Sequence, residues 1–276
     1  KYKSVRIGLT GKYAAVRDAY ASIAKSVEHC ATHQNVDAEL VWVEATEVTD
    51  DNVATMLADC DAVIVPGGFG SRGVEGKISV VKHCRTQNVP YLGICLGFQV
   101  AVIEFARNVI GLREANSLEF DQHCIQGVIN ELPEQKKIEQ LGGTMRLGGQ
   151  DVQVHPGTLA YHIFGRELIR ERFRHRYEVD PLYIERLEAG GMIFSGRHPV
   201  QPIMQILELP GPGEGPGGMG HPYFVAAQFH PELLGRPLRP EPMFMGLIAA
   251  AIQRRFPTAP ATRWTRPASE QPKQHS

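Results

Sequence analysis

The sequence has no long hydrophobic run and no excess of charge of either sign. No stretch of about 18 apolar residues occurs, and residues 1–5 lack the apolar segment of a signal peptide. We therefore expect a cytoplasmic protein that does not contact a membrane. Lys and Arg total 29 and Asp and Glu total 30, which argues against nucleic acid and favours small molecules or proteins as partners. The basic, aromatic residues 172–178 are interpreted as a short solvated or carboxylate-facing cluster.

Cysteine pairs at metal-binding spacing are also missing. The five cysteines are odd in number and none forms a C-x-x-C pair, which argues against a disulfide framework and against a zinc site. This usage predicts a reducing compartment and no metal. Because Lys1 is not an initiator methionine, we expect the chain to be processed or to be part of a longer protein.

The length and the apolar content are sufficient for one large domain. With 276 residues, 43% of them hydrophobic, the chain can bury a substantial core, which we assign to residues 1–256. Residues 257–276 are polar and rich in proline, with almost nothing to bury. They are predicted to form a disordered C-terminal tail.

Apolar runs and helical patterns alternate through the first 107 residues. Strands are expected at residues 5–10, 37–43, 61–65 and 90–94, with helices at about 18–30, 53–57, 74–85 and 96–107. Continuous rather than alternating hydrophobicity indicates burial on both faces, as in a parallel sheet. The sequence therefore predicts an α/β fold, doubly wound, with a mostly parallel central sheet flanked by helices. Residues 116–220 suggest an antiparallel excursion, followed by a strand at 223–229 and a helix at 242–253.

Cys95 falls on the turn between a predicted strand and a predicted helix. Gly93 and Gly97 lie two residues to either side, and their missing side chains allow the strand and helix to approach closely around an exposed elbow. Unpaired N–H groups at a helix start favour the thiolate, which is the nucleophilic form of cysteine. The alternative is a buried structural cysteine. The other four cysteines lack the flanking glycines and are interpreted as structural.

A cysteine nucleophile needs a base, and His230 in the segment Gln228-Phe229-His230-Pro231-Glu232 is the best candidate among 11 histidines. A residue before proline favours extended geometry, in which His230 and Glu232 would share a face. Glu232 could then hold one imidazole nitrogen while the other faces the thiol. A surface His-Pro-Glu turn is the alternative.

The segment Pro66-Gly67-Gly68-Phe69-Gly70 closes the third predicted strand with a glycine turn. The N–H groups of Gly68 and of Leu96, directly after the nucleophile, could stabilise a tetrahedral oxyanion. A simple tight turn is equally consistent with the local sequence. A phosphate-binding loop is not supported, because Ser71 and Ile78 stand where that motif requires Gly and Ser or Thr.

Together, these motifs resemble a class I, triad-type glutamine amidotransferase. Further segments, at residues 5–13, 116–121, 143–148 and 174–179, are similar to the glutaminase domain of CTP synthase, so the resemblance spans about residues 1–255. It implies hydrolysis of L-glutamine, with the ammonia passing to an N-terminal synthetase domain that aminates UTP using ATP, with GTP as activator. That synthetase domain is absent from this sequence. The full-length enzyme would also use Mg and is expected to be a homo-oligomer, whereas no cofactor is implied for this domain.

The resemblance also implies roles for individual residues. Cys95 would be the nucleophile, His230 the base and Glu232 its orienting partner. Glu119 would bind the α-ammonium group of glutamine, and Arg176 would frame its α-carboxylate end. Other glutamine-binding residues would be Gly68, Leu96, Gly97, Phe98 and Gln99. Arg146 would lie in the family's lid near the activator, and Phe98 stands where Met is common.

Three other functions remain open from the sequence. One is the glutaminase domain of an amidotransferase from another pathway, against which residues 116–121 and 144–148 argue. Another is a γ-glutamyl peptidase of the same fold. The third is a non-catalytic scaffold, against which the complete set of Cys95, His230 and Glu232 argues.

Overall fold

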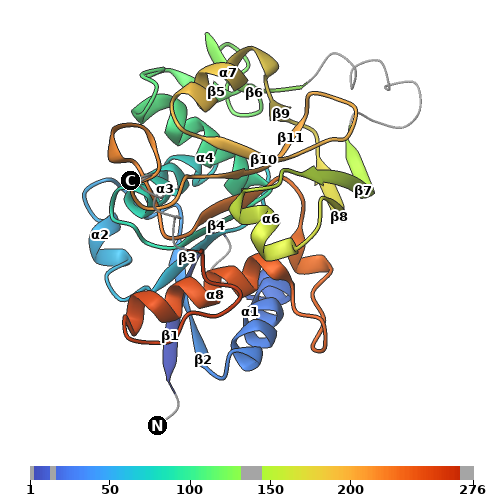
Figure 1. The fold of residues 1–276 in the computed structure, drawn as a ribbon. Coiled ribbons are helices and arrows are strands. Elements are labelled where there is room, and N and C mark those ends of the chain that lie inside the picture. Colours follow the sequence, from blue (N-terminus) through green and yellow to red (C-terminus); the bar gives the residue numbers. More distant parts are fainter. Residues whose placement is uncertain (1–2, 13–16, 132–144, 268–276) are drawn as a thin grey trace, which may run out of the picture.

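The computed structural model describes residues 3–12, 17–131 and 145–267. The strands of its main sheet are β1 (Ser4–Gly11), β2 (Asp37–Glu44), β3 (Ala62–Val65), β4 (Tyr91–Ile94), β7 (Arg146–Val154), β8 (Leu168–His175), β10 (Ile193–Arg197), β11 (Met204–Glu208) and β12 (Phe224–Ala227). Their order across the sheet is β2-β1-β3-β4-β12-β11-β10-β7-β8 (Figure 1). A smaller sheet joins β5 (Ala115–Ser117), β6 (Gln126–Asn130) and β9 (Glu178–Val179).

The main sheet has a parallel half and an antiparallel half. Strands β2, β1, β3, β4 and β12 pair in parallel, and the remaining strands, from β11 to β8, pair antiparallel. The predicted α/β class with a parallel core is therefore confirmed. The antiparallel excursion predicted for residues 116–220 is found in β7, β8, β10 and β11.

Helices cover both faces of the parallel half. The helices are α1 (Ala21–His33), α2 (Val53–Met56), α3 (Val74–Thr86), α4 (Leu96–Asn108), α6 (Leu159–Phe164), α7 (Pro181–Ala189) and α8 (Pro242–Arg255). Helices α1 and α8 contribute to one apolar core, and α3 and α4 contribute to the other (Figure 1). Along β3, Val63 and Val65 enter the core of α3 and α4, whereas Ile64 enters the core of α1 and α8. This burial on two faces explains why the strand is continuously apolar.

The basic segment at residues 172–178 has exposed arginines, as expected of a solvated cluster. Most of it belongs to β8, the edge strand of the sheet, in which exposed and buried residues alternate. Arg172 and Arg174 are exposed, while Phe173 and His175 point into the protein. The segment is therefore a half-buried strand whose basic side chains occupy one face.

The first part of the predicted tail packs against the domain. Trp264 is partly buried on the core that contains α1 and α8. Arg266 donates from Nη2 to the carbonyl oxygen of Leu209 at 2.8 Å, and the imidazole Nε2 of His162 lies 3.1 Å from the carbonyl oxygen of Thr265. These contacts at residues 257–267 differ from the expected disorder, because an indole ring and a guanidinium group find partners on the body. Residues 268–276 lie outside the described residues.

Within the ranges that the structure describes, no helix is both long and apolar enough to cross a membrane. All five cysteines are free.

Candidate active site

Three adjacent parallel strands bring the predicted catalytic segments together. Strands β3, β4 and β12 are neighbours, and Ile94 of β4 pairs with Ala227 of β12. The backbone N–H of Cys95 donates to the carbonyl oxygen of Ala227 at 2.7 Å. The glycine turn, Cys95 and the segment leading to His230 all follow the carboxyl ends of these strands. In an open α/β sheet, this is the edge where ligands bind.

The backbone around Cys95 forms the sharp elbow that the flanking glycines predict, but the residue is buried, with 3% of its surface exposed, and not exposed as expected. Cys95 has φ 52° and ψ −98°, a conformation that L-residues rarely adopt, and it directly precedes α4. A Cβ atom on Gly97 would lie 2.1 Å from the carbonyl oxygen of Val65, and one on Gly93 would lie 2.8 Å from Cβ of Ala226. Neither position could accept a side chain, so both glycines are required for the close approach of strand and helix.

Both Cys95 and His230 flank the glycine turn. A Cβ atom placed on Gly67 would lie 3.4 Å from Cβ of Cys95 and 3.0 Å from Cε1 of His230. His230 lies after β12, and its backbone N–H donates to the carbonyl oxygen of Arg172 at 2.9 Å. The two side chains therefore converge on one side of Gly67.

Glu232 holds the imidazole of His230. Its Oε1 lies 2.8 Å from Nδ1 of His230, as the spacing of the two residues predicts. The segment is not extended, however, because Pro231 begins a short 3-10 turn, Pro231–Leu233, that brings the carboxylate back to the ring. Burial alone would lower the pKa of His230, but its interactions with Cys95 and Glu232 outweigh burial and raise this pKa above its ordinary value.

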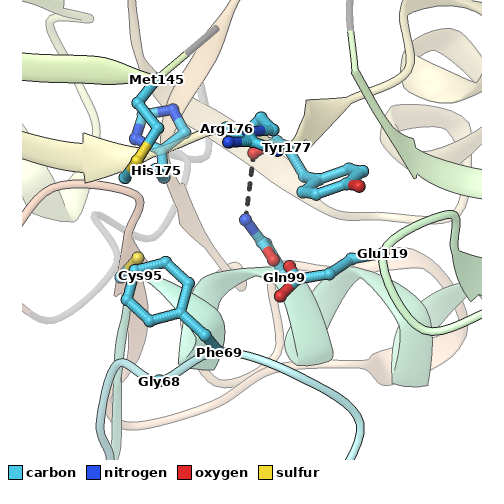
Figure 2. Close-up of a pocket in the computed structure, with 9 residues that line it drawn as sticks. All are labelled: Gly68, Phe69, Cys95, Gln99, Glu119, Met145, His175, Arg176 and Tyr177. Carbon is cyan, nitrogen blue, oxygen red and sulfur yellow. Dashed lines mark hydrogen bonds between the residues drawn. The ribbon is translucent and has the colours of Figure 1, made fainter. Parts of the chain in front are cut away.

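A cavity of about 250 Å³ opens beside Cys95 (Figure 2). It is lined by Gly68, Phe69, Cys95, Gln99, Glu119, Met145, His175, Arg176 and Tyr177. Four of the residues expected to bind glutamine, Gly68, Gln99, Glu119 and Arg176, are therefore in its wall. The side chains of Leu96 and Phe98 are buried and do not line it, and Gly97 packs against β3. A second cavity, of about 420 Å³, shares Gly68, Phe69 and Cys95 with the first and is lined by His230 and Glu232 as well.

The two ends of the cavity differ in chemistry. Figure 2 shows the sulfur of Cys95 and the carboxylate of Glu119 on opposite sides, with Gln99 between them. The backbone N–H of Gly70 donates to Oε1 of Glu119 at 2.9 Å, which fixes that carboxylate in the wall. Arg176 also lines the cavity. A ligand with a cation at one end and a reactive carbonyl group at the other would match the positions of Glu119 and Cys95.

Sequence reasoning missed several residues of the cavity wall, namely Phe69, Met145, His175 and Tyr177. His175 is buried, and its Nε2 lies 2.9 Å from Oε1 of the buried Glu178. The same Glu178 oxygen accepts from Nε of Arg146 at 2.5 Å, so Arg146 is anchored to the wall of the cavity. The alternation of residue types along β8 could have predicted that the side chain of His175 is buried.

Lys77 is a second buried group that the sequence did not reveal. Its side chain is almost fully buried, and Nζ donates to the carbonyl oxygen of Pro66 at 3.2 Å, directly before the glycine turn. Burial, together with the neighbouring charge of Lys12, lowers the pKa of Lys77 to about 7. This contact fixes the peptide group that leads into Gly67.

Among the described residues, no group of three or more His, Cys, Asp or Glu side chains is arranged to hold a metal ion.

Comparisons with known proteins agree with this geometry. The family model of class-I glutamine amidotransferases matches residues 15–250. CTP synthase of Staphylococcus saprophyticus is 49% identical over 248 residues, covering 90% of this chain and 45% of the relative. CTP synthase of Archaeoglobus fulgidus is 47% identical over 254 residues, covering 92% of this chain and 46% of the relative. The solved structure of the Trypanosoma brucei CTP synthase glutaminase domain, with bound acivicin, matches with a TM-score of 0.81 and 34% identity, covering 90% of this chain and 94% of that one.

The family match and the structural match show that the chain is an enzyme of the class I glutamine amidotransferases. The elbow at Cys95 and the contact between His230 and Glu232 agree with that class. Within that class, the chain belongs to the family of CTP synthase glutaminase domains. It spans slightly less than half the length of the CTP synthases it matches.

Proposed function

We propose that this chain hydrolyses the γ-amide of L-glutamine to glutamate and ammonia through a thioester on Cys95. The observation that carries the proposal is the convergence of the Cys95 elbow and the His230–Glu232 pair on the turn that contains Gly67. Cys95, His230 and Glu232 would then act as nucleophile, base and orienting carboxylate, in the manner of a catalytic triad.

In the first half of the reaction, the thiolate of Cys95 attacks the γ-carbonyl carbon, and a C–S bond forms. The N–H groups of Gly68 and Leu96 would stabilise the oxyanion, since Leu96 is the first residue of α4 and a helix start has unpaired donors. The imidazolium of His230 gives its proton to the leaving amide nitrogen. The C–N bond breaks and ammonia departs, leaving a glutamyl thioester.

In the second half, neutral His230 takes a proton from water, and the resulting hydroxide attacks the thioester. The C–S bond breaks, glutamate leaves and the thiolate–imidazolium pair is restored. Glu232 keeps Nδ1 protonated throughout, so Nε2 is the nitrogen that exchanges protons.

The cavity wall supports assignments for substrate binding. Glu119 would pair with the α-ammonium group and Arg176 with the α-carboxylate, while Gly68 and Gln99 would contact the side-chain amide. Leu96, Gly97 and Phe98 would act through the backbone of the first turn of α4, because their own atoms are packed in the protein.

We also propose that the ammonia serves the amination of UTP to CTP by a synthetase domain of the same polypeptide. The identity to two CTP synthases over 90% or more of this chain supports that assignment. The full-length protein would then use ATP and Mg, respond to GTP and form a homo-oligomer. Five free cysteines fit the reducing environment of the cytoplasm, where we expect it to work.

The test is covalent labelling with an electrophilic glutamine analogue, followed by mass spectrometry, together with an assay of glutamine hydrolysis. We expect one modification, on Cys95, and competition by glutamine. Equal labelling of Cys124, which is partly accessible whereas Cys95 is buried, would refute the assignment. Faster turnover of γ-glutamyl peptides than of glutamine would indicate a peptidase instead. On this chain alone, GTP should change the rate little, since the chain spans less than half of the length of the relatives it matches.

A further inference from the structure

Gln228 is a buried polar residue that the proposed reaction does not yet use. It follows β12, two residues before His230, and its side chain has no exposed surface. Its amide nitrogen Nε2 lies 3.7 Å from Sγ of Cys95, within hydrogen-bonding range for sulfur. A buried amide that reaches the nucleophile is a candidate for a role in the chemistry.

Neighbouring groups fix which end of the Gln228 amide faces the sulfur. Nε2 of Gln99 donates to the carbonyl oxygen of Tyr177 at 3.0 Å, a contact visible in Figure 2, and also to Oε1 of Gln228 at 3.2 Å. An amide nitrogen only donates, so the group it contacts on Gln228 must be the oxygen. The remaining end of Gln228, its NH₂ group, therefore points at Cys95.

The sulfur of Cys95 is thus placed between an acceptor and a donor. The carbonyl oxygen of Arg174 lies 3.8 Å from Sγ and can accept from the neutral thiol. The NH₂ group of Gln228 faces the sulfur as a hydrogen-bond donor. This hydrogen bond is strongest when the sulfur is negatively charged, because hydrogen bonds to ions are stronger than those between neutral groups. Loss of the thiol proton therefore weakens the contact with Arg174 and strengthens the contact with Gln228.

We propose that Gln228 is a catalytic residue whose side-chain N–H stabilises the thiolate of Cys95, both before attack on the substrate and when the thiolate leaves the thioester. The proposal rests on the proposed function, in which that thiolate is the nucleophile. His230 supplies and removes the proton, whereas Gln228 exchanges no proton and acts only as a hydrogen-bond donor. Gln99 is the positioning residue that keeps the amide in this orientation.

The experiment compares Gln228→Met with Gln205→Met in the 276-residue chain. Methionine has a similar shape but no N–H donor. Gln205 is an equally buried glutamine of β11, and its backbone oxygen accepts from the N–H of Gln228, but its side chain has no hydrogen-bond partner among the described residues. The rate of Cys95 alkylation by iodoacetamide is measured from pH 5 to 10. This probe needs no glutamine site, so the result does not depend on whether the chain is a glutaminase.

We expect Gln228→Met to move the midpoint of the acid limb of alkylation to higher pH by about one unit, with the rate at high pH unchanged. At a pH below the midpoint, the variant should react roughly tenfold more slowly. The Gln205→Met profile should coincide with that of the unmodified chain. A Gln228→Met midpoint that does not move, or that moves equally in Gln205→Met, would overturn the proposal. So would a loss of rate that is the same at every pH.

A second variant keeps the test decisive if Gln228→Met does not fold, as judged by its thermal melting. Gln99→Met retains the N–H of Gln228 but removes the group that orients it. We expect a shift in the same direction and of smaller size. An unchanged profile in a folded Gln99→Met chain would contradict the inferred orientation and with it the proposal.

Discussion

Nδ1 of His230 lies 2.8 Å from Oε1 of Glu232, and a single proline separates the two residues in the chain. Since Pro231 opens a short 3-10 turn, the contact is made locally and does not depend on a distant segment. The carboxylate accepts the proton of Nδ1, which leaves Nε2 directed to the other side of the ring. This arrangement gives a specific prediction for the pH dependence of the enzyme.

Glu232→Gln should reduce the rate of glutamine hydrolysis by about 10²–10⁴-fold with the fold intact, because the imidazole loses the group that orients it and stabilises its cation. Glu232 is one of the groups that raise the pKa of His230, so its removal lowers this pKa. The alkaline limb of the rate should therefore move to lower pH. Steady-state rates from pH 6 to 10 measure this shift, with Glu185→Gln, an exposed position on α7, as the control. An unmoved alkaline limb would show that another group orients His230.

Substitutions at Cys95 should distinguish the loss of the nucleophile from the strain of the backbone at this residue. Alanine, serine and glycine should all abolish hydrolysis, since a hydroxyl group ionises far less readily than a thiol and the other two have no nucleophile. Glycine should nevertheless give a more stable protein than alanine, by about 1 kcal/mol, because Cys95 has φ 52°. Thermal melting compares the two. At Cys124, where φ is not positive, glycine should be the less stable of the pair.

Burial of Glu171 should make stability depend on pH. Desolvation raises the pKa of Glu171 to about 8 in the folded chain, above its unfolded value, so the folded state holds the proton more tightly. The free energy of unfolding should therefore fall as the pH rises from about 4.5 towards 8. Glu171→Gln should be more stable than the unmodified chain at pH 9 and nearly equal to it at pH 4. Urea unfolding at both pH values measures these free energies of unfolding, and Glu167→Gln, at an exposed position, is the control. Equal changes in the free energy of unfolding for the two variants would contradict the prediction.

The segment at residues 257–267 should contribute to stability. A chain that ends at residue 256 loses the hydrogen bond from Arg266 to Leu209 and the packing of Trp264, so its melting temperature should fall by several degrees. A chain that ends at residue 267 keeps every contact described for this segment and serves as the control. Equal melting temperatures of the two truncated chains would show that the segment only rests on the surface.

The sequence predicted the parts of the site that depend on local backbone geometry. Gly93, Cys95 and Gly97 are close in the chain, and the need for close packing at two of these positions is visible in the residue types alone. The pair of His230 and Glu232 was also predicted, although through an extended segment rather than the turn that Pro231 begins.

Other parts of the site depend on contacts between distant segments and could not be predicted in this way. The direction of the Gln228 amide is set by Gln99, which lies 129 residues earlier in the chain. The segment around Trp264 is held by His162 and Leu209, which lie 103 and 57 residues before their partners Thr265 and Arg266. The edge strand β8 was overlooked because its arginines dominated the composition, although its alternating pattern was present.

Because Ala227 pairs with Ile94, two adjacent strands set the distance between Cys95 and His230. The 134 residues that lie between them in the chain do not set it. A chain cut within the loop at residues 210–218 would carry the nucleophile on one fragment and the base on the other. Addition of β12 to β4 would have to rebuild the sheet before any glutamine could be hydrolysed. The glutaminase activity of the mixed fragments would therefore measure how much of β12 has paired with β4 in the correct register.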